Sequence, residues 1–217
     1  MSNTLPVIEA KAQHLARDAN LNITSASAGL IAANRIYRRF AQIAAWPELH
    51  RQTTLTTVAA QEKYSATALD TWFDIQRVEI QDDRDSDKYA VIGPANTQAR
   101  WARAGYEADG FPDLYQMENS AGVNKLALRP RPDTAQASNT IRVSGQIIPT
   151  DLTASATTFC RNVLADDALA LMIAADWQFK RGQAEHANHL LQRSVEIIMS
   201  LTGKEITVAE MAVKLKE

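Results

Sequence analysis

Two short pieces in the middle of this 217-residue chain restrict its backbone more than any others. The first, Gly110-Phe111-Pro112-Asp113-Leu114-Tyr115, sets glycine and proline before strand-forming residues, so it predicts a turn that leads into a half-buried strand. The second, Leu126-Ala127-Leu128-Arg129-Pro130-Arg131-Pro132-Asp133, predicts a strand that its prolines end, because proline cannot donate to a β-ladder. Neither piece carries a catalytic group. This content favours a structural part of an assembly over an enzyme.

The patterns at both ends of the chain predict helices. Residues 6–45 are rich in alanine and show apolar residues at helical spacing, with a break at residues 20–22. Residues 157–180 repeat this pattern, and a further helix follows that runs to about Leu201 and ends at Gly203. Several helices of this kind would pack as a bundle.

The middle of the chain has a different character. Its β-branched and alternating segments predict strands, a charged loop lies at residues 81–88, and a short helix bearing Trp101 is expected at 96–104. The strands are expected at residues 53–58, 73–80, 114–117, 125–128 and 141–144, and residues 61–65 follow the first of them.

Together these patterns predict an α+β chain that is mainly helical. Residues 1–50 and 151–203 would form a bundle of amino- and carboxyl-terminal helices. Residues 51–150 would form an inserted small antiparallel β-domain, and residues 204–217 a carboxyl-terminal docking tail.

The composition limits which cellular compartment and which binding partners the protein can have. The chain is 46% hydrophobic and 22% charged, which is ordinary for a globular protein, and its formal net charge of −2 gives no bulk attraction to nucleic acid. The single cysteine, Cys160, excludes an internal disulfide and is interpreted as a small buried residue. The start of the chain lacks a signal sequence, and no apolar run approaches the roughly 20 residues that span a bilayer. We therefore expect synthesis in the cytoplasm and no membrane partner.

A basic row lies on the helix predicted before Pro47. Arg35, Arg38 and Arg39 fall on one side of it, where they could line a subunit interface, face DNA phosphates, or pair with acids on a neighbouring element.

The strongest catalytic candidate in the sequence is weak. Glu185, His186 and His189 share one helical stretch, and the histidine spacing could place two ligands on a metal. A third convergent ligand is not evident, so we interpret them as surface residues. The sequence also lacks a glycine-rich phosphate loop and a nucleophile elbow. We therefore expect no enzyme activity, no metal and no cofactor.

The last residues predict an amphipathic docking element. Residues 205–217 are near the lower limit for an isolated helix, which needs about 12–15 residues to be even marginally stable. Val208, Met211, Ala212 and Leu215 nevertheless fall on one side. Such a segment gains order by laying its stripe into the groove of a partner.

The order of these features resembles the head-to-tail adaptor proteins of tailed bacteriophages. The resemblance covers nearly the whole chain and is carried by an ordered set of short pieces. These are Trp46, Thr53 to Thr57, Gln61 to Tyr64, Gly110 to Tyr115, Leu126 to Asp133, Leu152-Thr153 and the alanine-rich Ala168 to Ala175.

The resemblance implies a structural virion protein of the neck, at the junction of head and tail. Such adaptors form a ring, usually of twelve copies, below the portal protein, and bind tail, stopper or nozzle proteins on the other side. The ring encloses the channel through which double-stranded DNA passes without sequence-specific binding. Carboxyl-terminal extensions of adaptors commonly contact the portal, which is what the resemblance implies for the tail. The family has no catalytic residues to carry over.

Three other interpretations stay open at this point. The chain could be a metal-dependent helical enzyme that uses Glu185, His186 and His189. It could be a non-viral helical module whose sheet binds a peptide by edge pairing. Within phages it could be a stopper or tail-completion protein, although those are usually smaller and richer in strand.

Overall fold

The computed structural model describes residues 4–24, 28–65, 67–82, 84–95, 109–120, 123–153, 158–159 and 162–216. The chain divides into two compact units, a helical unit made of Met1–Leu49 with Ile148–Glu217 and a sheet unit made of His50–Ile147. The helix predicted at residues 96–104 and the predicted burial of Cys160 lie outside the described residues.

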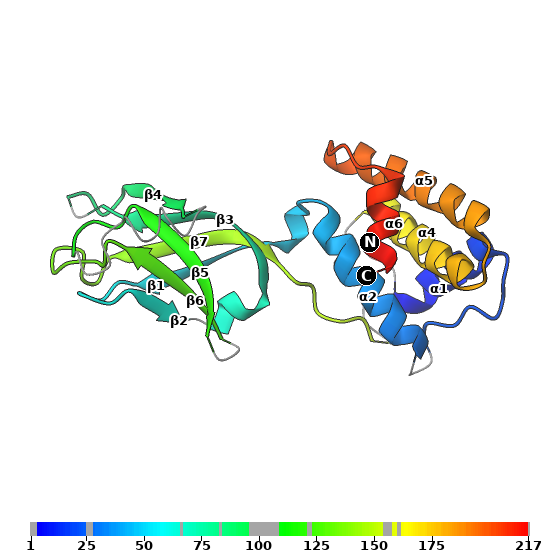
Figure 1. Ribbon diagram of the computed structural model, residues 1–217, viewed down its shortest axis with the longest axis horizontal. Helices are drawn as coiled ribbons and strands as arrows, with labels where there is room; N and C mark the ends of the chain where they lie inside the picture. Colours follow the sequence, from blue (N-terminus) through cyan, green and yellow to red (C-terminus); the bar gives the residue numbers. More distant parts are fainter. Residues whose placement is uncertain are drawn as a thin grey trace. The chain divides into compact units, whose positions relative to one another are not determined.

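Five α-helices lie in the described part of the helical unit (Figure 1). The central one, α4, contacts α1, α2 and α5, and its buried residues run around most of its circumference. A helix that is apolar on all sides belongs in an interior. The helices are α1 (Leu5–Ala16), α2 (Ala28–Ile43), α4 (Val163–Lys180), α5 (Ala184–Thr202) and α6 (Val208–Lys216), with a 3-10 turn, η1 (Pro47–Leu49), after α2.

Local signals set the ends of these helices. Asn162 caps α4, because its side chain accepts a hydrogen bond from the Leu164 amide at 2.9 Å. Gly203 ends α5 in the left-handed conformation, with a φ of 66°, which confirms the end predicted from the sequence.

Aromatic side chains fill one part of the helical core. Phe40 and Trp46 stack with ring centroids 4.7 Å apart, and Phe159 lies 5.8 Å from the Trp46 ring. The indole N–H of Trp46 donates to the Phe40 carbonyl at 3.0 Å, so this buried ring leaves no unpaired donor.

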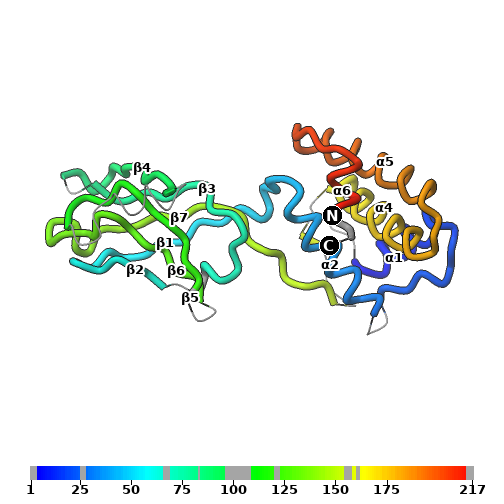
Figure 2. Tube along the Cα trace, in the orientation of Figure 1, coloured from blue at the N-terminus to red at the C-terminus, as the bar shows by residue number. Residues whose placement is uncertain are grey.

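Seven strands form one sheet in the described part of the sheet unit, in the order β1-β7-β3-β4-β5-β6-β2. Figures 1 and 2 show that the sheet is curled. All neighbouring strands are antiparallel except β4 and β5, which run parallel. The strands are β1 (His50–Thr56), β2 (Lys63–Ser65), β3 (Trp72–Gln81), β4 (Tyr89–Pro94), β5 (Leu114–Ser120), β6 (Val123–Arg129) and β7 (Thr140–Ile147), with a 3-10 turn, η2 (Thr67–Thr71), before β3.

The predicted fold class is therefore wrong. The chain is not mainly helical with a small antiparallel β-domain inserted, because its sheet unit holds a large, curled, mixed sheet. Sequence patterns underestimated the sheet because β4 follows a charged loop and ends at Gly93-Pro94, which is a turn signal. The parallel pair arises because residues 95–113 connect β4 to β5, and so long a connection need not make a hairpin.

The two backbone-restricting pieces of the sequence lie side by side in the sheet unit. The Gly110 amide donates to the Arg131 carbonyl at 2.8 Å, and the Asp113 amide donates to the Arg129 carbonyl at 3.1 Å. Beyond this point the two pieces continue as the β5–β6 ladder. Their glycine and prolines thus shape one local structure, and the strands predicted at 114–117 and 125–128 are confirmed within it.

A third piece joins the same structure. Arg129 is only 3% exposed, and its Nε lies 2.9 Å from the Glu62 carboxylate. The hydroxyl of Tyr64 donates to the Gln61 carbonyl at 2.9 Å. Burial raises the pKa of the Tyr64 phenol, and its hydrogen bond to the Val58 backbone opposes this effect. The pieces Gln61 to Tyr64, Gly110 to Tyr115 and Leu126 to Asp133 thus meet in one hydrogen-bonded structure.

Candidate functional site

The basic row on α2 is engaged within the helical unit. Arg35 lies 3.1 Å from the Asp176 carboxylate. Arg38 donates from Nε to Asp151 at 2.8 Å and makes a second bond to the same carboxylate, which raises the pKa of Arg38. Arg39 also has an interaction. Arg35 and Arg38 thus balance acids of their own unit, and a phosphate could bind either of them only by competing with those acids.

The tail residues form helix α6, which packs on the helical unit. A reciprocal cap starts the helix, since the Glu210 carboxylate accepts from the Thr207 amide at 2.8 Å and the Thr207 hydroxyl accepts from the Glu210 amide at 3.2 Å. Met211 is fully buried, and Lys204 donates to the Ile43 carbonyl at 2.6 Å.

The other predicted docking residues are less enclosed than Met211. Val208 and Ala212 are half-buried, and the side chain of Leu215 lies outside the described residues. Val213 points away from this stripe and is 56% exposed. The apolar stripe predicted to dock on a partner is therefore covered, at least at Met211, by the chain itself.

The histidine pair does not form a metal centre in the described part of the chain. His186 places its Nε2 3.2 Å from the Leu15 carbonyl, and His189 is exposed. Among the described residues, no group of three or more histidine, cysteine or acidic side chains could hold a metal ion.

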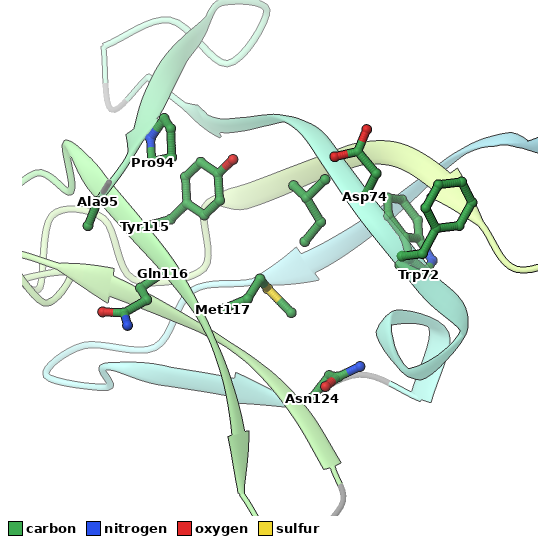
Figure 3. Close-up of a pocket in the computed structure, with 10 residues that line it drawn as sticks. Trp72, Asp74, Pro94, Ala95, Tyr115, Gln116, Met117 and Asn124 are labelled. Atoms are coloured by element: carbon green, nitrogen blue, oxygen red, sulfur yellow. The ribbon is translucent and has the colours of Figure 1, made fainter. Parts of the chain in front are cut away.

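The sheet unit contains a pocket that the sequence patterns did not indicate. It has a volume of about 360 Å³ and lies between the first half of β3 and the middle of β5 (Figure 3). Apolar side chains form much of its wall, with one acid and two amides among the described lining residues. The lining residues are Trp72, Phe73, Asp74, Ile75, Pro94, Ala95, Tyr115, Gln116, Met117 and Asn124.

Two polar groups give this pocket its chemistry. Asp74 is exposed and is the one charged residue in the described lining. Burial raises the pKa of the Tyr115 phenol, and the negative charge of Asp74 raises it further. The side-chain oxygen of Gln116 is buried and has no hydrogen-bond partner among the described residues. The pocket therefore presents one negative charge beside a largely apolar wall.

No local signal could have located this pocket. The alternation of residues 73–80 predicts β3, and β5 is predicted as well, but the space between them depends on where β4 stops. Since β4 was not predicted, its end could not be placed.

The described residues form two compact units, and their candidate sites are a basic row paired with acids, a packed terminal helix and a pocket in the sheet unit. Residues 5–204 match the family described as SU10 adaptor protein, and the chain belongs to this family of phage structural adaptors. The resemblance to phage adaptors is confirmed at this level. Family membership makes the chain a virion component that interacts with other head and tail components. A comparison with curated proteins found no match. None of the described helices combines the length and apolar character needed to cross a membrane.

Proposed function

We propose that this chain is the head-to-tail adaptor of a tailed phage. Several copies, twelve by analogy with such adaptors, would form a ring below the portal and join the DNA-filled head to the tail, stopper or nozzle proteins. The observation that carries the proposal is the extent of the family match, which begins at residue 5 and ends at residue 204. It therefore spans both the helical and the sheet unit.

The charges of the chain are compatible with a DNA channel at the centre of the ring. Twelve chains at −2 each total −24, and a ring of that charge has no general attraction for DNA. Because Arg35 and Arg38 are already paired with Asp176 and Asp151, they would hold passing phosphates weakly. Such a channel suits double-stranded DNA that slides through without sequence-specific binding.

The tail is the proposed portal-docking element, with Val208, Met211, Ala212 and Leu215 as its stripe. Because Met211 is buried in the chain's own helical unit, docking through this stripe requires α6 to leave its place. Docking through the opposite side requires no such change and would use Val213. Val213→Asp separates the two routes: it abolishes portal binding if the outer side docks and leaves it intact if the released stripe docks.

The proposal is tested by measuring the molar mass in solution of the purified chain, first alone and then mixed with the portal of its own phage. We expect a monomer or weak oligomer alone, because the sequence shows no long heptad repeat, and a ring-sized complex with the portal. A stable closed ring without portal, or no complex with it, would contradict the proposal.

The two alternatives from other classes have their own test. Elemental analysis of the purified chain should show no stoichiometric transition metal. A bound metal that disappears in the His186→Ala, His189→Ala double variant would instead favour a metal-dependent enzyme. A chain that binds peptides but never joins a portal would favour a non-viral binding module, and its location in the tail would favour a tail-completion protein.

A further inference from the structure

A groove runs along the helical unit between α1 and α5, with α4 beneath it (Figure 1). Both outer helices pack on α4 but make few contacts with each other among the described residues. They meet at one end, where Nε2 of His186 on α5 lies 3.2 Å from the Leu15 carbonyl of α1. From there the groove extends along α5 to Ile197, which is about 16 Å further along that helix. We call this the α1–α5 groove.

The groove has the size and the apolar surface of a binding site. Its volume is about 390 Å³, within the range of about 300–1,000 Å³ that ligand pockets occupy. Leu164 and Leu171 of α4 line it, together with Leu15 of α1 and Ile197 of α5. Leu164 is 49% exposed. A single exposed leucine is ordinary, but apolar side chains of three helices gathered in one groove indicate a contact surface.

Positive groups stand on both sides of this apolar strip. Lys11 and His14 lie on the α1 side, and Arg193 lies on the α5 side. Asp167 is the one acid in the described lining, and it pairs with Lys11. Arg193 is exposed and forms no ion pair with a described residue, unlike Arg35 and Arg38 on α2. The groove therefore carries unbalanced positive charge.

This local charge differs in sign from that of the chain as a whole. The full chain has a formal net charge of −2, so long-range attraction does not bring acidic partners to it in general. A carboxylate placed beside Arg193 would nevertheless gain an ion pair at little desolvation cost, because both groups keep contact with water. A basic side chain at the same place would face like charge.

We propose that the α1–α5 groove binds an acidic amphipathic helix of another protein. The apolar face of that helix would cover Leu164 and Ile197, and carboxylates on its flanks would meet Arg193 on one side and Lys11 on the other. A helix suits the groove because its side chains fit between those of two neighbouring helices as ridges into grooves. The inference depends neither on ring formation nor on docking through α6.

The probe is a blocked peptide of about 18 residues, which exceeds the roughly 12–15 residues that a helix needs. It carries leucine on one helical face, glutamate on both flanks of that face and alanine elsewhere. The peptide is titrated into the isotope-labelled full chain, and methyl signals are followed by nuclear magnetic resonance. Signals of Leu164, Leu171 and Ile197 should shift and saturate, while Val91, an exposed apolar residue of the sheet unit, should not respond.

Charge is tested in the peptide and in the chain. A peptide with lysine in place of glutamate should bind at least fivefold more weakly, because Arg193 then faces like charge. Arg193→Gln should weaken the glutamate peptide by about two- to fivefold, as expected for a solvent-accessible ion pair. The matched control is Arg84→Gln, which removes an exposed arginine of the sheet unit and should change nothing.

The apolar contact is tested with two adjacent residues of α4. Val163 and Leu164 are exposed to almost the same extent, but only Leu164 is in the described lining of the groove, since neighbouring residues of a helix point in different directions. Leu164→Ser should weaken the glutamate peptide by about four- to tenfold, because the exposed half of the leucine is no longer there to be covered. Val163→Ser should leave the affinity within about twofold, since the helix does not reach it.

Four results would overturn the inference. The first is the absence of methyl shifts in the groove at peptide concentrations that shift Val91. The second is equal affinity for the lysine and glutamate peptides. The third is an equal loss of affinity in the two serine variants. The fourth is a groove whose methyl signals shift with protein concentration alone while the molar mass doubles, because its occupant would then be a second copy of the chain.

Discussion

Arg129 shows how a single residue holds the sheet unit together. It lies at the end of β6, is almost fully buried, and meets the Glu62 carboxylate from the segment before β2. A buried charge is tolerated only when it is paired and hydrogen-bonded. The pair thus ties together two stretches that are far apart in the sequence.

Replacing Glu62 with leucine should therefore destabilise the fold strongly. Removing one member of a buried pair typically costs about 3–5 kcal/mol, because the remaining charge loses its ion-pair partner. Urea unfolding measures the change. Asp85→Leu is the control, since Asp85 pairs with Lys88 at the surface and should hardly shift the midpoint. Similar midpoints for the two variants would refute the structural role given to Arg129.

Alanine substitutions at two glycines are expected to differ in their effect on stability. A Cβ at Gly145 would lie 2.1 Å from the Asp74 carbonyl oxygen, whereas a Cβ at Gly110 would meet nothing closer than 3.9 Å. Gly145→Ala should cost about 1–3 kcal/mol, as overpacking does, because backbone must move. Gly110→Ala should stay close to the unmodified chain in the same unfolding experiment, although Gly110 belongs to a family-like piece. A more harmful Gly110→Ala would show that the local geometry is wrong.

Tyr115 gives a pH dependence with a definite sign. Burial and Asp74 raise the pKa of its phenol in the folded state, so the unfolded chain releases this proton first as pH rises. Its contribution to stability is complete below the ordinary tyrosine pKa of about 10 and is lost above it. Between about pH 9 and 11, the unmodified chain should lose more unfolding free energy than Tyr115→Phe. Identical losses in urea titrations at both pH values would contradict this assignment.

At the scale of single elements, helix α6 makes the tail part of the fold. The sequence shows an apolar stripe, but the same stripe serves equally for docking on a partner or on the chain itself. Met211 is fully buried and Ile206 is 9% exposed, so the structure favours the second use in the isolated chain. The family match ends at residue 204, so α6 lies beyond it.

Truncation after Gly203 should therefore destabilise the helical unit. Burial of one methionine or isoleucine is worth about 1.5–3 kcal/mol, so loss of Ile206 and Met211 should cost about 3 kcal/mol or more. Truncation after Val213 keeps both residues and should cost much less. Thermal unfolding of the two forms measures the difference. Equal stability of both with the full chain would show that α6 does not stabilise the helical unit.

Sequence patterns predicted some elements well and others not at all. Alternation over residues 73–80 indicated β3, and Gly203 marked the end of α5, because both signals are local. Strand β4 was not predicted from the sequence, because its six residues include Gly93 and Pro94 and its pairing depends on distant strands. The pocket between β3 and β5 was not predicted for the same reason, since it depends on where β4 ends.

The residues predicted to interact with partners also show that local sequence patterns do not give tertiary contacts. The spacing of Arg35 and Arg38 placed them on one side of a helix, but their acids, Asp176 and Asp151, come from the other end of the chain. Such partners are set by tertiary structure.

At the scale of the whole chain, the account combines family membership with two units of different construction. In the helical unit, Arg35 and Arg38 pair with acids and Met211 of helix α6 is buried, and the sheet unit contains a pocket between β3 and β5. Neither unit assembles a metal cluster from its described residues. Membership of the phage adaptor family implies contacts with other head and tail components.

The central claim is tested most directly by electron cryo-microscopy of intact virions of the phage that encodes this chain. The account predicts a ring of copies between portal and tail, with density for both the helical and the sheet unit in every copy and an open channel at the centre. Density for the chain in the capsid shell, in the tail tube, or nowhere in the virion would contradict it.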